Sequence, residues 1–124
     1  MQYLSAEWLE AARRALAAAG DPGDAVADVA LTVEQVVDAT TFHITLDHGK
    51  VTLADGPAAA PDLRLTTDYA TAAAVAAGEL TAQRAFVEGR LRVGGDLSLL
   101  ITHQRALAAV DDALAGVRAR TTYR

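Results

Sequence analysis

The chain has 124 residues and a mass of 12.9 kDa, a size typical of one domain with a single hydrophobic core. Its 11 basic and 16 acidic residues give a formal charge of −5, which argues against a dedicated nucleic-acid binder and against stable docking on anionic membranes. The absence of cysteine excludes disulfides, thiol catalysis and thiolate metal sites.

Apolar residues make up 52% of the sequence but aromatic residues only 5%, so Ala, Val and Leu supply most of the material for a core. An interior of small side chains is compatible with a cavity and equally with tight helix packing. No segment approaches the ~20 consecutive apolar residues of a membrane-spanning helix. The N-terminus lacks the basic-then-apolar pattern of a signal peptide, so we expect a soluble, cytoplasmic protein.

Residues 5–19 have the pattern of an amphipathic helix, with Ser5 as a candidate N-cap. The apolar face of this helix consists of residues at intervals of four: Trp8, Ala12 and Leu16. The sequence Asp21-Pro22-Gly23-Asp24 then predicts a break in the chain. From about Val29 the hydrophobic period changes to two, which is typical of a half-buried strand.

Residues 41–47 form a second alternating run, and the dipeptide His48-Gly49 after it can make the two-residue turn of a β-hairpin. A turn at this point pairs Leu46 with Val51 and keeps the apolar residues of both arms on one face. Because the turn and the hydrophobic pattern give the same register, the sequence predicts a hairpin here.

The second half of the chain combines short strands and helices. Residues 63–66 alternate as a fourth strand, and Thr67 or Asp68 is placed to cap a helix that follows it. Thr81 is placed to cap a second helix, and a fifth strand and a final apolar helical region come after it.

The resulting order of elements, α-β-β-β-β-α-α-β-α, predicts an α+β fold. We expect a mostly antiparallel sheet of about five strands covered by helices, with the first three strands in a meander. The connection that precedes the fifth strand is long enough to cross the sheet.

The segment from Gly78 to Asp96 carries the most specific pattern in the chain, a capped helix, a glycine stop, a short strand and a paired-glycine turn. This order resembles the signature of the sterol carrier protein 2 (SCP2-like) lipid-binding family, at Gly78, Leu80, Ala85, Phe86, Gly89, Leu91, Val93, Gly95 and Asp96. Residues 60–66 also resemble the family's strand before the middle helices. The resemblance covers roughly Val26 to Val110 of one domain, 1–124, whose polar tail, 118–124, is expected to fray.

The resemblance implies that sheet and helices enclose an apolar cavity that binds a fatty acid, acyl-CoA or sterol without chemical change, as in a small bacterial member of the family. It implies no catalytic residue, metal or cofactor. The partners are then an apolar small molecule or lipid, with at most transient membrane contact and no nucleic acid, and pairing with a second copy of the chain stays open. The residues expected to form the apolar interior, with a subset lining the cavity, are Phe42, Ile44, Leu46, Leu63, Leu65, Val75, Leu80, Phe86, Leu91, Val93, Leu97, Leu100 and Ile101.

Two other functions remain open. An oligomerisation or partner-binding module is favoured if the apolar face of the last helix is exposed; this face is formed by Leu107, Val110, Leu114 and Val117. A small enzyme is favoured if a cavity contains His103 or carboxylates with strongly shifted pKa values. The arginines at 84, 90 and 92 fit either a solvated strand face or a cationic rim that attracts a carboxylate at a pocket mouth.

Overall fold

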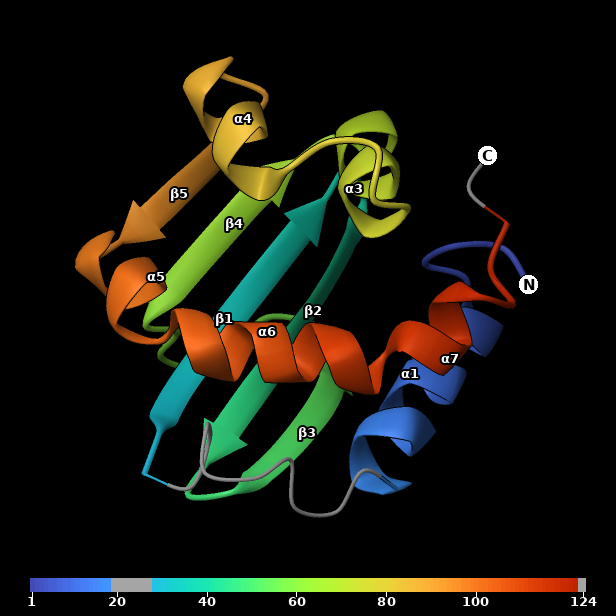
Figure 1. Cartoon of the computed structure of the whole chain (residues 1–124), viewed down its shortest axis with the longest axis horizontal. Helices are drawn as coiled ribbons and strands as arrows, with labels where there is room; N and C mark the ends of the chain where they lie inside the picture. The colour runs from blue at the N-terminus through green and yellow to red at the C-terminus, as the bar shows by residue number, and fades with distance from the viewer. Residues whose placement is uncertain (19–27, 123–124) are drawn as a thin grey trace.

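The computed structural model describes residues 1–18 and 28–122, which form a five-stranded sheet with helices on one face and along one edge (Figure 1). The predicted order of strands and helices is confirmed, and the final helical region is divided into three helices. The elements are α1 (Ala6–Ala18), β1 (Ala30–Val37), β2 (Thr40–Asp47), β3 (Lys50–Asp55), β4 (Leu63–Thr67), α3 (Tyr69–Ala76), α4 (Ala82–Val87), β5 (Leu91–Gly95), α5 (Ser98–Thr102), α6 (Gln104–Ala113) and α7 (Ala115–Arg118).

The strand order is β3-β2-β1-β4-β5, which puts β1 at the centre of the sheet. The first three strands form the predicted antiparallel meander, and Leu46 pairs with Val51 as the hairpin register requires. His48 and Gly49 have φ values of 48° and 94°, the left-handed pair of a type I′ turn. Because β4 is parallel to β1 and antiparallel to β5, the sheet is mixed but mostly antiparallel.

The connection that crosses the sheet is the segment 56–62, between β3 at one edge and β4 on the far side of β1. The connection before the fifth strand is long enough to cross the sheet, but it does not do so, because β5 pairs directly with β4. The helices α3 and α4 therefore cover the sheet without carrying the chain to another part of it. The length of a connection permits a crossing but does not reveal which strand it reaches.

Glu34 holds the crossing segment on the face of the sheet opposite the helices. Its neighbours on β1, Val33 and Gln35, point to the helical face, so Glu34 points away from it. Its carboxylate accepts a hydrogen bond from the backbone N–H of Ala58 at 2.8 Å and another from the guanidinium of Arg64, its pairing partner on β4. These bonds hold the pKa of Glu34 below its usual value, and the bond from Arg64 is the main cause. The residue is only 2% exposed.

Replacing Glu34 by glutamine is expected to lower the Tm by several degrees at neutral pH and by less in acid. The folded protein binds the Glu34 proton more weakly than the unfolded chain does, because the folded-state pKa lies below the usual 4.5. The carboxylate therefore stabilises the fold above that pH, and the contribution disappears as the pH falls through the lowered pKa. Thermal melts from neutral pH to about pH 3 measure this difference.

The matched control for this prediction is Glu79→Gln, at an exposed position. We expect it to leave the Tm nearly unchanged at every pH. A difference between wild type and Glu34→Gln that stays constant into acid would contradict the role given to the Glu34 carboxylate.

The helix α1 lies along the edge strand β3. Ser5 Oγ accepts the backbone N–H of Trp8 at 3.1 Å, which confirms the predicted N-cap. The guanidinium of Arg13 donates to the carbonyl of Leu53 at 3.1 Å and so satisfies an acceptor on the outer edge of the sheet. Residue 19 of the predicted helix and the predicted break at 21–24 lie outside the described residues.

The two ends of the described chain pair with each other (Figure 1). The N–H of Thr122 donates to the carbonyl of Met1, and the N–H of Tyr3 donates to the carbonyl of Thr122 at 3.0 Å. The predicted fraying of the tail is therefore wrong as far as residue 122, and residues 123–124 lie outside the described residues. Within the part of the chain that the structure describes, the helices are too short or too polar to cross a bilayer.

Candidate functional site

A partly open cavity of about 210 Å³ lies between the inner face of the sheet and the helices. Every strand contributes to its floor, with Gln35 from β1 and Leu91 from β5 among the floor residues. Its walls come from α1, α3, α4 and the residues around α7. In Figure 1, α3, α4 and α6 stand in front of the sheet, with α3 and α4 above α6, and α1 and α7 lie together at its right-hand edge.

The helical walls of the cavity are built largely from alanine. Ala72 and Ala76 come from α3, and Ala82 and Ala85 come from α4. An alanine side chain extends only one carbon from the helix backbone, so space remains where longer side chains would fill it. The small-residue composition noted in the sequence therefore accompanies a cavity and not only tight packing.

Two predicted caps fix the start of the wall helices. The carboxylate of Asp68 accepts the backbone N–H of Thr71 at 2.7 Å, and Thr81 Oγ1 accepts the backbone N–H of Arg84 at 3.1 Å. The bond from the Thr71 N–H is the main cause of a lowered pKa for Asp68. Both caps are confirmed, so local sequence signals determine where α3 and α4 begin.

Trp8 forms an aromatic wall of the cavity with Tyr3 and Phe42. Its ring centroid lies 5.0 Å from that of Tyr3 at an interplanar angle of 84°, and 6.3 Å from that of Phe42 at 66°. Such edge-to-face pairs keep large rings in fixed positions. Trp8 is also the single tryptophan in the sequence, so its fluorescence reports on the cavity.

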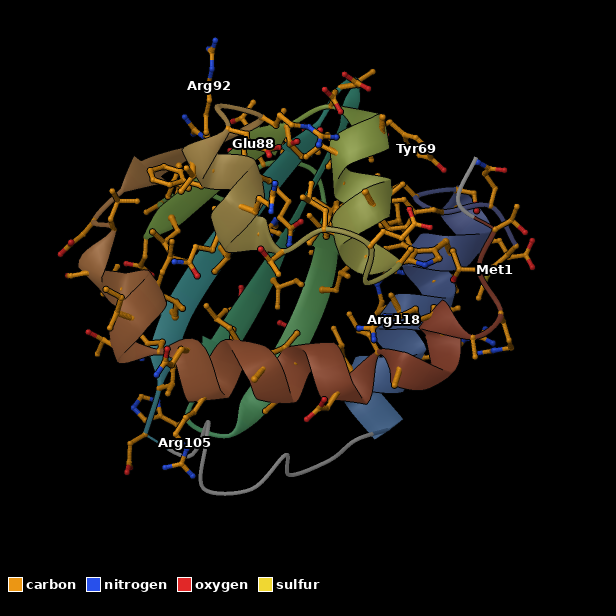
Figure 2. All side chains as sticks on the ribbon, turned by 45° about the horizontal axis from the view of Figure 1, so that its top comes forward. Met1, Tyr69, Glu88, Arg92, Arg105 and Arg118 are labelled. Carbon is orange, nitrogen blue, oxygen red and sulfur yellow. The ribbon has the colours of Figure 1, made fainter. Side chains whose placement is uncertain are left out.

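Besides the rings of Tyr3 and Trp8, the polar lining residues are few: Gln35, Thr67, Thr71 and Arg118. Thr67 Oγ1 donates to the carbonyl of Arg90 at 2.9 Å, and Arg90 Nε donates to Thr71 Oγ1 at 3.2 Å. Figure 2 shows Arg118 on the side of α7 that faces the rest of the molecule. No aspartate, glutamate or histidine is among the described lining residues, so the arrangement suits binding by apolar contact with a few oriented polar groups.

The cavity brings together a subset of the predicted interior residues: Phe42, Ile44, Leu65, Val75 and Leu91. Other predicted residues are inside the protein without lining it. Leu46 and Leu63 are fully buried in the core, and Leu80, Val93 and Leu100 are half-buried. A direct role of any of these residues in ligand binding stays a prediction.

The prediction that Phe86, Leu97 and Ile101 belong to the interior is wrong. Their side chains are 43%, 45% and 74% exposed, and the fully buried residue of α4 is Ala85. Helical spacing shows which residues share a face, but not whether another element covers that face.

Sequence reasoning missed several lining residues, among them Tyr3, Trp8, Gln35 and Arg118 as contributors to the cavity. The first two and Arg118 come from opposite ends of the chain, which no local pattern brings together. Gln35 had a visible signal, because it stands on the inward side of an alternating strand between Val33 and a second buried valine.

None of the arginines at 84, 90 and 92 is among the described lining residues, although Arg90 bonds to the lining residue Thr71. Arg84 Nε lies 3.1 Å from a carboxylate oxygen of Glu88, and Arg90 Nη1 lies 3.6 Å from the other oxygen. These contacts lower the pKa of Glu88, and the hydrogen bond from Arg84 is the main cause. Arg92 projects away from the molecule in Figure 2, as expected for a solvated strand face.

The apolar face of the last helical region packs on the core. Val117 is 1% exposed, Val110 is buried, and Leu107 and Leu114 are partly buried against the same cluster. The condition that favours an oligomerisation module, an exposed apolar face on this helix, is therefore not met.

A model of the SCP-2 sterol transfer family matches residues 6–108, which is most of the chain. The chain belongs to the SCP-2 sterol transfer family. A crystal structure of sterol carrier protein 2 has the same fold, with a TM-score of 0.68, 21% sequence identity and coverage of 94% of this chain and 98% of that one. The solution structure of palmitated SCP2L2 from Aedes aegypti gives a TM-score of 0.60 and 23% identity, over 84% of this chain and 94% of that one.

The SCP-2 fold also appears inside a larger enzyme. The sec-alkylsulfatase Pisa1 from Pseudomonas sp. matches 71% of this chain with a TM-score of 0.58 and 23% identity, but this chain covers only 14% of the alkylsulfatase. At these identities the solved structures establish a shared α+β fold and no shared activity. None of the curated proteins compared with the chain matched it significantly.

Proposed function

We propose that this SCP-2 protein binds and carries an apolar ligand in the cavity between sheet and helices, and that it does not alter the ligand chemically. The single observation that carries the proposal is the partly open, largely apolar cavity in a chain of this family. The palmitated state of the Aedes aegypti neighbour supports a fatty acid or acyl-CoA as ligand, and the family description supports a sterol-like lipid.

The size of the cavity favours an acyl chain over a sterol. At about 210 Å³ it exceeds the ~150 Å³ void that accepts benzene but is smaller than typical ligand pockets of ~300–1,000 Å³. It therefore accommodates a segment of chain, and the rest of the ligand extends through the open side. Burial of ~10 methylenes gains about 8 kcal/mol and association costs about 4 kcal/mol or more, so the expected affinity is modest.

We further propose a cytoplasmic setting with at most transient membrane contact during ligand exchange. The acidic charge of −5 supports this, because it opposes lasting electrostatic attachment to anionic lipid surfaces. The described lining residues include no aspartate, glutamate or histidine, which supports binding without catalysis.

Titration with a fatty acid or a long-chain alcohol is expected to change the fluorescence of Trp8 in a saturable way, with a blue shift as the ligand displaces water. Isothermal titration calorimetry on the same samples checks the stoichiometry. The control is Trp8→Phe, which removes the optical signal but should leave calorimetric binding within a few-fold of wild type. Folded protein that shows no saturable binding by either method would refute the carrier proposal.

A further inference from the structure

Gln35 is a polar residue on the inner face of the central strand β1. Its neighbours on this face are Val33 and Val37 along β1, Phe42 across on β2, and Leu65 across on β4. The first three are at most 4% exposed. The amide therefore interrupts an otherwise apolar surface at the middle of the sheet.

The side chain of Gln35 lines the cavity, and its amide makes no side-chain hydrogen bond within residues 1–18 and 28–122. Gln35 is half-buried among apolar neighbours, and an apolar residue at this position would bury more apolar surface on folding. The two threonine hydroxyls of the lining, Thr67 and Thr71, are already bonded to Arg90. The hydrogen-bonding capacity of Gln35 is thus left for a group that enters the cavity.

We propose that Gln35 determines ligand specificity by hydrogen bonding an uncharged polar head, a hydroxyl or a carbonyl, of a ligand whose hydrocarbon part lies along the apolar lining. This inference rests on the proposed carrier function and specifies the ligand class. The amide has both a donor NH₂ and an acceptor oxygen, so it pairs with either head. The side chains beside Gln35 on the sheet are apolar, so this position favours an uncharged head, whereas the carboxylate of a fatty acid would stay at the open side of the cavity.

The test compares two ligands of equal chain length, 1-octanol and 1-chlorooctane, by the fluorescence of Trp8. The measured quantity is the ratio of their dissociation constants in wild type and in Gln35→Met, a nearly isosteric change that removes the hydrogen bonds. Dividing the two ratios cancels the difference in hydration between the ligands. We expect the preference for octanol to fall about tenfold in the variant, while the affinity for chlorooctane is kept or improved.

The matched control is Gln83→Met, an exposed glutamine on α4 outside the lining, and its ratio should equal that of wild type. The Tm of Gln35→Met should be unchanged or higher, whereas a merely structural role of the amide would lower it. Gln35→Leu serves as a second variant if Gln35→Met does not fold.

An unchanged ratio in the folded variants overturns the inference about Gln35 and leaves the carrier proposal in place. Wild-type protein that binds neither ligand saturably overturns both.

Discussion

Ala76→Phe is expected to reduce the affinity for an acyl-chain ligand at least tenfold. Ala76 lines the cavity from α3, and a phenyl ring fits within about 210 Å³, since a void of ~150 Å³ accepts benzene. The ring would occupy the space of several methylenes, and excluding only two of them costs about 1.6 kcal/mol. Calorimetric titration with a fatty acid measures the loss.

The same substitution at Ala70 is the control, because Ala70 is an exposed residue of α3 that does not line the cavity. Ala70→Phe should bind like wild type, and Ala76→Phe should be at least as stable as wild type because it fills a void. Equal binding by both variants would show that the ligand lies somewhere else on the protein.

Gly95→Ala is expected to destabilise the fold by about 2–4 kcal/mol. Gly95 has a φ of +100°, and a Cβ at this position would lie 2.3 Å from the carbonyl oxygen of Asp62. The carbonyl cannot easily move away, because Asp62 is bonded to Thr32 through its backbone N–H at 2.9 Å and through its carboxylate at 2.8 Å. Urea denaturation measures the free energy of unfolding.

The substitution Gly94→Ala at the neighbouring position is the control. It distinguishes the steric clash at Gly95 from a general sensitivity of β5 to replacing glycine by alanine. A Cβ on Gly94 would meet Arg64 Cβ at 3.7 Å, an ordinary van der Waals contact. We expect a change of no more than about 0.5 kcal/mol in that variant. Similar losses in the two variants would mean that the close approach of Gly95 to Asp62 does not limit stability.

Features that depend on neighbours in the sequence were predictable. The hairpin at His48-Gly49 and the cap at Asp68 each depend on residues within a few positions of one another, and both are present. In each case two local signals agree, such as the turn residues and the alternation of apolar side chains.

Features that depend on distant segments were not predictable. Glu34 follows the outward alternation of β1 yet is buried, because the crossing segment from another part of the chain lies over it. Ile101 follows the inward face of a helix yet is exposed, because no described element covers that face. The hydrophobic period shows which face of a strand or helix a side chain lies on. Only the tertiary arrangement decides whether another element covers that face.

The cavity was predictable only in part from the sequence. Its strand residues Ile44 and Leu65 follow from alternation, and the resemblance to a lipid-binding family suggested their role. Trp8 and Arg118 come from opposite ends of the chain, and the packing of α1 against β3 and α7 brings them to the cavity. Gln35 interrupts the apolar positions of β1, and extending the alternation of this strand beyond Val33 places it on the inward face.

The pairing of β1 with β4 has a consequence for the order in which the protein folds. Two tight turns join β1, β2 and β3, so the meander can form at little cost in loop-closure entropy. Placing Leu63 beside Val33 requires a much longer loop to close, which makes the arrival of β4 the slower event. Since β4 also supplies part of the cavity floor, no intermediate that lacks it can hold a guest, and a bound ligand should slow unfolding without accelerating collapse.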